Sequence, residues 1–508
     1  MLATTSAATM CGISGQPVRV EVHVASGLPA YTIVGLPDAT CRESRDRVRA
    51  AILSSGLTFP QQRVTVNLAP SGLRKIGAGL DLAIAMGILV ASEQATKEVV
   101  QRIRSMAFLG ELGLDGAVRG IAGTLPMAAA LDADELVVPM VNAGEAELLA
   151  RHVVRPVAHL TELLGALDGK APWPDPPPAP RRAESPAGPD LAHVRGQPFA
   201  RLAAEVAAAG GHHLLLVGPP GAGKTMLAER VPSLLPRLDP DAALEVTSIH
   251  SAAAEPLPAG RLIDQPPFRA PHQTASMVSI IGGGSHALRP GEVSLAHRGV
   301  LFMDEMGEFP AVVLDGLRQP LESGSIRVSR AQASATMPAG FLLVAAMNPC
   351  PCGHGGSLRC ECSEPMVRRY RRRVSGPLLD RFDLRLVVDV PDRHQLADST
   401  PGESSASVAC RVAQVRARAR QRGVAANSRL AATQLDECSI LDEPARAMLE
   451  RALDEGRLSG RGLVRVRAVA LTLDDLRGGD GHLDREVVAQ ALMLRTEIDL
   501  RTDSVVRA

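Results

Sequence analysis

The sequence predicts an α/β protein with a parallel sheet at its centre, and three stretches of the chain carry this prediction. Residues 214–217 form a short apolar run that leads into a glycine-rich loop and then a helix. Residues 299–303 and 341–347 are two further apolar runs, and each is followed by polar residues. Short continuous apolar runs are typical of strands buried on both faces, as in sheets covered by helices.

The loop after the first strand fits the pattern G-x-x-x-x-G-K-[ST], in which backbone N–H groups and a helix N-terminus cradle nucleotide phosphates. Its lysine, Lys224, is one of only four Lys in a chain that has 51 Arg. A compact ammonium suits a position where a point charge must reach β- and γ-phosphates. We therefore expect this loop to bind a nucleotide through Gly218, Pro219, Pro220, Gly221, Ala222, Gly223, Lys224 and Thr225.

The polar residues that follow the other two apolar runs supply the remaining chemistry. Asp304 is expected to hold Mg²⁺ together with the Thr225 hydroxyl, and Glu305 to polarise the attacking water. Asn348 stands where it would contact the γ-phosphate or that water. Each residue alone is equally typical of a turn after a strand. It is the succession of three such strands that predicts ATP and Mg²⁺ as cofactors.

Two arginines complete the expected site. Arg381 precedes an apolar strand expected at residues 384–390, and it is a candidate arginine finger for the nucleotide of a neighbouring subunit. Arg461 opens a helix with helical apolar spacing, from which it is expected to reach the γ-phosphate as part of a lid. In a chain with 51 Arg, either residue alone is more often a surface or ion-pair residue. Their positions relative to the other motifs are the reason for assigning them to the site.

Longer motifs give the chain a family resemblance. The segments PFRAPHQTA (267–275), RPGEVSLAH (289–297) and AMNPCPC (346–352) resemble the magnesium-chelatase-like AAA+ ATPases called YifB or ComM, as do residues 281–284 and 317–322. The resemblance covers nearly the whole chain and implies an AAA+ P-loop core with a helical lid. It implies a homo-oligomer, a hexameric ring, with Walker A, Walker B, sensor 1, finger and sensor 2 roles for Lys224, Thr225, Asp304, Glu305, Asn348, Arg381 and Arg461.

The resemblance also implies a function and its alternatives. ComM-type proteins are branch-migration motors that act on DNA during natural transformation, so ATP hydrolysis in a ring that drives DNA branch migration is the expected function. The chelatase subunits instead power metal insertion into a porphyrin, so a motor acting on a chelatase or protein partner is the alternative. A nucleotide-controlled assembly switch is a third, and Glu305 and Arg381 argue against it.

The chain is expected to divide at a Pro-rich stretch, residues 171–190, whose composition indicates a stiff linker. Before it, residues 1–170 form a separate α/β domain that resembles the Lon-protease (S5-type) fold, with alternating strands at 18–24 and 64–68 and a helix at 43–55. Neither a Ser between Ile76 and Ala91 nor a Lys between Gly110 and Gly169 is present, so the domain is expected to be non-proteolytic. An ATPase core at 191–395 and a helical lid at 396–508 follow.

Composition excludes some classes of protein. The net charge is zero, so contacts with nucleic acid must come from local patches. No basic residue occurs in the first 17 residues, and no run approaches 18 apolar residues, which argues against a signal peptide and a membrane span. Eight Cys without a secretory signal indicate a reducing compartment, so a cytoplasmic location is expected.

Four of the cysteines fall within thirteen residues, and four thiolates suit tetrahedral Zn²⁺. Their C-x-C spacing is tighter than usual, so an ordinary loop with free thiols is the alternative. The candidate ligands are Cys350, Cys352, Cys360 and Cys362.

Three basic segments are candidate DNA contacts. Residues 368–373 hold five Arg, and five more load a helical stretch at 411–422. Both clusters are also compatible with solvated or interface faces, and we favour that interpretation for the second. A hairpin expected at 326–335 would place Arg327 or Arg330 in the pore of a ring, and the glycine-rich segment 281–289 resembles a second pore insert.

Overall fold

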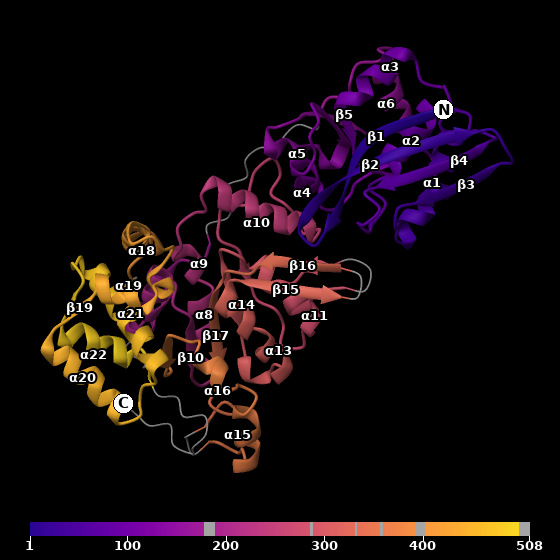
Figure 1. Cartoon of the computed structure of the whole chain (residues 1–508). Helices are drawn as coiled ribbons and strands as arrows, with labels where there is room; N and C mark the ends of the chain where they lie inside the picture. Colours follow the sequence, from indigo (N-terminus) through magenta and orange to yellow (C-terminus); the bar gives the residue numbers. More distant parts are fainter. Residues whose placement is uncertain (177–187, 285–287, 331–332, 356–358, 392–401, 497–508) are drawn as a thin grey trace.

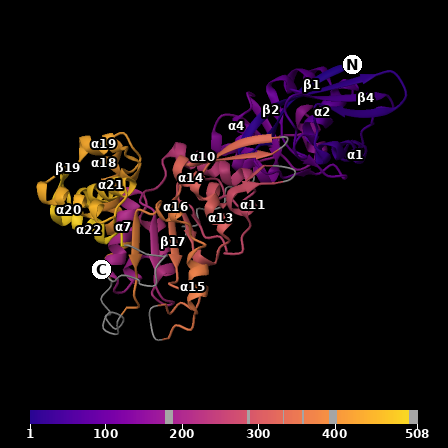
Figure 2. The same cartoon turned by 60° about the horizontal axis from the view of Figure 1, so that its bottom comes forward.

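The computed structural model describes residues 1–176, 188–284, 288–330, 333–355, 359–391 and 402–496. Figure 1 shows an α/β unit formed by the first 170 residues at one end of an elongated molecule, a second α/β unit in the middle, and the C-terminal helices packed on its side. The view turned by 60° shows the same arrangement (Figure 2).

A seven-stranded mixed sheet in the order β3-β4-β2-β1-β5-β8-β9 organises the N-terminal unit. The expected alternation is confirmed, because Val18, Val20, Val22 and Val24 of β2 are all buried. The helix expected from residue 43 begins at Ala39 instead, since the Asp38 side chain caps it by accepting the Cys41 N–H at 2.7 Å. The elements are β1 (Leu2–Cys11), β2 (Ser14–Ala25), β3 (Ala30–Val34), α1 (Ala39–Ser54), β4 (Arg63–Ala69), α2 (Asp81–Ala91), α3 (Lys97–Arg102), β5 (Met106–Phe108), β6 (Glu111–Leu112), β7 (Val118–Arg119), α4 (Thr124–Ala129), β8 (Glu135–Pro139), α5 (Ala143–Ala146), β9 (Val153–Val157) and α6 (Leu160–Leu167).

The resemblance of this unit to a Lon-type domain stays a prediction. Lys75, the lysine of the matching segment, is completely buried, and its ammonium donates to the Pro70 carbonyl of its own loop. Such a contact closes a turn and needs no substrate.

The middle unit contains a five-stranded parallel sheet in the order β11-β14-β17-β10-β18. All its strands point the same way, so their carboxyl ends meet at one edge of the sheet. Strand β18 ends at Val387 and not at residue 390, because its partner β10 ends at Val217 opposite it. The elements are α7 (Pro198–Gly210), β10 (Leu214–Val217), α8 (Lys224–Ala228), α9 (Val231–Leu234), α10 (Pro240–Ala252), β11 (Phe268–Arg269), α11 (Met277–Ile281), β12 (Gly282–Gly283), β13 (Arg289–Pro290), α12 (Glu292–Leu295), β14 (Val300–Met303), η5 (Met306–Glu308), α13 (Ala311–Gly316), α14 (Arg318–Ser323), β15 (Ser325–Arg330), β16 (Ala333–Pro338), β17 (Leu342–Met347), α15 (Glu364–Arg371), α16 (Gly376–Leu379) and β18 (Leu384–Val387).

The C-terminal helices share an apolar core with the middle unit, because buried residues of α18 and α21 belong to the same cluster as those of α7. A buried polar chain reinforces this contact. Asp383, just before β18, accepts hydrogen bonds from His212 at 3.0 Å and from Arg465 of α21. Burial opposes the charge, but these donors hold the pKa of Asp383 below its usual range. The elements are α18 (Ser405–Gln421), α19 (Ala432–Cys438), β19 (Ile440–Leu441), α20 (Glu443–Asp454), α21 (Gly460–Arg477), β20 (His482–Leu483) and α22 (Arg485–Met493).

Among the helices that the structure describes, none combines the length and the apolar character that a membrane span requires.

Candidate active site

The glycine-rich loop connects the carboxyl end of β10 to the start of α8, at the edge where the parallel strands end. Gly218 cannot be replaced without moving backbone, since a Cβ on it would lie 2.1 Å from the Val388 carbonyl oxygen. Gly221 and Gly223 have φ values of +80° and +83°, a region that favours glycine. The glycines of the motif are therefore needed for the shape of the loop.

Lys224 lies inside this loop with its side chain almost fully buried. Its ammonium donates to the carbonyl oxygens of Gly218 at 2.7 Å and Pro219 at 2.9 Å, and to Oδ1 of Asn348 at 3.2 Å. Burial lowers the pKa of Lys224, while the charges of Asp304 and Glu305 oppose that shift. The structure thus brings together the ends of β10 and β17, although Lys224 and Asn348 are 124 positions apart in the sequence.

The candidate Mg²⁺ ligands also meet. The Thr225 hydroxyl donates to Oδ2 of Asp304 at 2.8 Å, which ties the start of α8 to the end of β14. A hydroxyl and a carboxylate beside a phosphate-binding loop are the donors that Mg²⁺ takes in such sites. Glu305 follows with an exposed side chain and a left-handed backbone, φ +49° and ψ +44°. Few residues other than glycine adopt that conformation, and it is often found at functional sites.

The two candidate arginines lie together elsewhere. Arg381 and Arg461 line one cavity of about 370 Å³ next to Asp383. The Asp383 N–H bonds the His213 carbonyl at the amino end of β10, whereas Lys224 sits beyond the carboxyl end of that four-residue strand. The strand alone spans about 13 Å. Within one chain, Arg461 therefore lies at the edge of the sheet opposite the glycine-rich loop.

Glu322 of α14 also lines this cavity, although no role was predicted for it from the sequence. Arg381 is nearly buried and donates to Oε1 of Glu322 at 2.6 Å and to the Pro377 carbonyl at 2.8 Å. The carboxylate holds the guanidinium in place at the mouth of the cavity. The contact between Arg381 and Glu322 could not be predicted from the sequence, since the two residues are 59 positions apart.

The four candidate zinc ligands form one cluster after β17. All four Sγ atoms lie within 4.8 Å of one another. The pairs among Cys350, Cys352 and Cys360 are 3.3 to 3.8 Å apart, close to the roughly 3.8 Å edge of a tetrahedral Zn–S₄ site. Hydrogen bonds from the backbone of His354 and from the Cys350 thiol lower the pKa of Cys352 to about 6, which favours the thiolate that binds metal. The donor set fits zinc.

The arginine cluster at 411–422 is mostly engaged inside the protein. Arg411 pairs with Glu205 and Glu403, Arg416 donates to the Ala208 carbonyl, and Arg418 and Arg422 pair with Asp475. These four arginines are therefore held by partners within the chain, which neither the DNA-contact interpretation nor the solvated or interface interpretation anticipated, whereas Arg420 is exposed. In the other cluster, Arg368, Arg369 and Arg372 are exposed.

The expected hairpin is confirmed as β15 and β16, with Arg327 opposite Thr336 and exposed. Residues 331 and 332 at its tip lie outside the described residues, and so do 285–287 of the second expected insert. The tip of the β1–β2 hairpin rests on β16, because a Cβ on Gly12 would come 2.7 Å from the Ala335 Cβ. The hairpin is thus in contact with the N-terminal unit.

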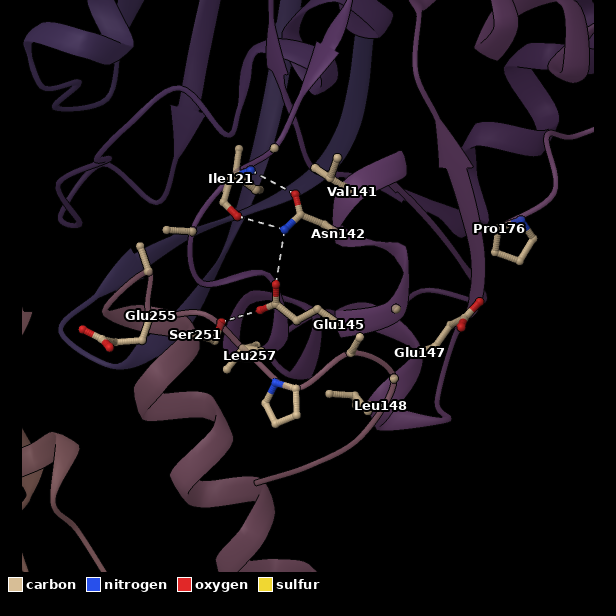
Figure 3. Close-up of a pocket in the computed structure, with 17 residues that line it drawn as sticks. Ile121, Val141, Asn142, Glu145, Glu147, Leu148, Pro176, Ser251, Glu255 and Leu257 are labelled. Atoms are coloured by element: carbon tan, nitrogen blue, oxygen red, sulfur yellow. Dashed lines mark hydrogen bonds between the residues drawn. The ribbon is translucent and has the colours of Figure 1, made fainter. Parts of the chain in front are cut away.

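A second contact between the units surrounds a cavity of about 720 Å³ (Figure 3). Figure 3 shows Glu145 of α5 between Asn142 and Ser251 of α10. The Ser251 hydroxyl donates to Glu145, and the Ser251 carbonyl accepts the Gly123 N–H at 3.0 Å. These polar groups satisfy one another, so we interpret them as an interdomain contact. The sequence could not predict it, since Glu145 and Ser251 are 106 positions apart.

Comparison with known proteins matches this architecture. The family "Magnesium chelatase, subunit ChlI" matches residues 190–396, "Subunit ChlI of Mg-chelatase" matches 20–142, and its C-terminal family matches 402–495. The competence protein ComM of Haemophilus influenzae is 40% identical over 497 residues, 96% of each chain. The chain belongs to the YifB/ComM family. YifB of Escherichia coli is 42% identical over 95% of each chain, and an uncharacterized protein of Mycobacterium tuberculosis is 44% identical over 92% of this chain and 93% of its own.

Membership of this magnesium-chelatase-like AAA+ family agrees with the described sheet. In chain order the five parallel strands take the positions 2-3-4-1-5, so the phosphate-binding strand lies between the fourth and the fifth. The Walker residues therefore sit at the carboxyl edge of the central strands, where ligands bind in open α/β sheets.

Proposed function

We propose that this YifB/ComM-family protein is a ring-forming ATPase that hydrolyses ATP to drive branch migration of DNA in the cytoplasm. The division of its site supports this most strongly. Lys224, Thr225 and Asp304 meet at one edge of the core sheet, while Arg381 and Arg461 lie together at the other. A second copy would have to bring its arginines to the nucleotide, which a closed ring, expected to be hexameric, achieves at every interface.

The residues of one chain have separate tasks in this mechanism. Lys224 would exchange loop carbonyls for phosphate oxygens, and Thr225 with Asp304 would hold Mg²⁺, which neutralises charge on the phosphates. Asn348 would orient the γ-phosphate, and Glu305 would accept a proton from the attacking water. Arg381 and Arg461 of the neighbour would stabilise the charge that develops on the transferred phosphoryl group.

DNA is the preferred substrate because of the exposed Arg327 of the hairpin, the exposed arginines of the α15 segment and the likeness to a competence protein. A motor acting on a chelatase or protein partner is the second candidate, since all three matching families are named for a magnesium chelatase subunit. The ATPase rate without DNA, and with single strand, duplex and a four-way junction, separates the two. A DNA motor is stimulated most by the junction, whereas a rate unchanged by every DNA contradicts the DNA assignment.

Replacing Arg327 and Arg330 together by Ala is expected to weaken DNA binding and leave basal ATPase unchanged. Each phosphate contact releases counterions, so the slope of log affinity against log salt should fall by about 1 to 2. Binding to a labelled junction at several salt concentrations measures this. Arg446→Ala, an exposed arginine of α20 outside the three candidate segments, is the matched control. Parent-like affinity and salt slope in the double variant would remove the hairpin from the DNA path.

We also propose that the cysteine cluster holds one structural Zn²⁺ per chain. Purified protein is expected to contain about one zinc per chain, and Cys352→Ser with Cys360→Ser is expected to lose it. Elemental analysis measures this, with Cys410→Ser, an exposed thiol far from the cluster, as the control. Fully active protein without zinc would contradict the site and leave the ATPase proposal intact.

A further inference from the structure

Helix α15 follows the cysteine cluster and packs against the turn that carries Glu305. Its exposed side bears Arg368, Arg369 and Arg372. The opposite side presents Tyr370, whose ring is 3% exposed, toward η5. Figure 1 shows α15 at the end of the core farthest from the N-terminal unit. The helix thus has a solvent face and a face on the candidate catalytic turn.

The Tyr370 ring lies directly on Gly307, two residues after Glu305. A Cβ on Gly307 would stand 2.3 Å from Cζ and 2.5 Å from the hydroxyl oxygen of Tyr370, so only glycine fits there. The φ of Gly307 is not positive, so this requirement is one of space and not of backbone conformation. A hydrogen bond from the backbone of Asn348 reaches the Tyr370 hydroxyl. One ring therefore contacts the Walker B turn and the end of the sensor strand.

Arg373 holds the same turn from the other side of Gly307. Its Nη1 donates to the Gly307 carbonyl at 2.8 Å and to Oε2 of Glu308 at 2.7 Å. The Glu308 N–H in turn donates to the Glu305 carbonyl at 2.7 Å. A continuous set of contacts therefore runs from α15 to the backbone of Glu305.

Glu305 needs such support, because the left-handed region is strained for a residue other than glycine. The strain persists only where surrounding contacts fix the conformation. In the described structure the Asp304 carboxylate accepts the Glu305 N–H at 2.9 Å, and the tyrosine ring and the guanidinium hold the residues that follow.

We propose that Tyr370 and Arg373 are positioning residues that hold the Asp304–Glu308 turn in the conformation needed to present Glu305 to the attacking water. This inference rests on the proposed ATPase function. Neither residue is among those expected to contact the nucleotide, so their removal is expected to lower kcat and spare ATP affinity.

The first test compares single variants in full-length protein. Tyr370→Ala and Arg373→Ala are expected to lower kcat by about 10- to 100-fold, the scale of a small misplacement of a catalytic group. The Kd of a fluorescent ATP analogue should stay within about twofold, since uniform binding is untouched. Tyr370→Phe keeps the ring and is expected to retain most of the rate. Arg372→Ala, the exposed neighbour, is the matched control for Arg373.

The second test uses the contact between Gly307 and the Tyr370 ring. Gly307→Ala should lower kcat by clashing with the ring, and adding Tyr370→Ala should make room for the new methyl group. The double variant is then expected to be no slower than Tyr370→Ala alone, a non-additive result that residues in contact give. Additive losses, or a kcat unchanged by Tyr370→Ala and Arg373→Ala, would overturn the proposal.

The outcomes of these tests distinguish a failure of the positioning role from a failure of the proposed ATPase function. A parent protein that does not hydrolyse ATP contradicts the proposed function, whereas an active parent with indifferent variants contradicts only the positioning role. Binding of the ATP analogue also serves as a control that the P-loop is folded in each variant. Should Tyr370→Ala fail to fold, Arg373→Ala still decides, because the Arg373 side chain is 38% exposed and its removal leaves no large void.

Discussion

Glu305→Gln is expected to bind ATP as tightly as the parent protein and to hydrolyse it at least about 100-fold more slowly. The amide keeps the size and the hydrogen-bonding reach of the side chain, but it cannot accept a proton from water, and general-base catalysis is worth about 10²- to 10⁴-fold. Because Glu305 is exposed and is not bonded to Lys224, ground-state binding should not change. Single-turnover hydrolysis and analogue binding measure the two effects separately.

Lys224→Ala is the informative opposite, since it should lose ATP binding as well as turnover. Lys224 meets phosphate oxygens in the ground state, and its removal also leaves the Gly218 and Pro219 carbonyls without their donor. Glu229→Gln is the control for Glu305→Gln, because it also removes one negative charge near the loop. Glu229 is an exposed residue just after α8. Near-normal turnover in Glu305→Gln would assign the water to another residue.

Arg381→Ala is expected to reduce turnover by about 1000-fold, the scale of an arginine finger, while each chain still binds ATP. Arg461→Ala should behave in the same way, because both arginines line one cavity at the edge of the sheet opposite the P-loop. Multiple-turnover rates and analogue affinity at matched protein concentration measure this. Loss of ATP affinity in Arg461→Ala without loss of assembly would instead place that residue in its own chain's site.

Mixing two inactive variants tests the shared site directly. An Arg381→Ala chain keeps Glu305, and a Glu305→Gln chain keeps Arg381, so a mixed ring contains interfaces in which both groups are intact. Activity should therefore reappear on mixing, with a maximum at intermediate ratios. Arg420→Ala is expected to leave rate and mixing behaviour unchanged. A monomer that hydrolyses ATP at full rate at low concentration would rule out the shared site.

The nucleotide half of the site could be predicted from sequence because its residues occur in short, ordered motifs. Gly218, Gly221 and Gly223 are fixed by local backbone demands, and Lys224 and Thr225 follow them in the same turn. Apolar runs that end in acids or amides predict strand ends, and parallel strands bring those ends together. The contacts of Lys224 with Asn348 and of Thr225 with Asp304 agree with this expectation.

The arginine clusters show where sequence reasoning stops. From the sequence, a helix with five arginines between 411 and 422 is compatible with a DNA-binding face or with a solvated or interface face, and the ion pairs within the chain were not predicted. The choice depends on Glu205, Glu403 and Asp475, which lie between 8 and 206 positions from their arginine partners. Only folding brings these carboxylates into place.

The sequence by itself determined the P-loop, the strand before it, the helix after it, the cysteine spacing and the hairpin, because each depends on interactions within a few residues. Tertiary structure decided where Arg461 lies, which acids pair with Arg381 and Arg411, and how Tyr370 meets Gly307. These depend on side chains that are distant in the chain and are brought together by packing of the sheet and helices. Such contacts obey no local spacing, so they became visible only when the fold placed α15 on the Walker B turn and Arg461 beside Arg381.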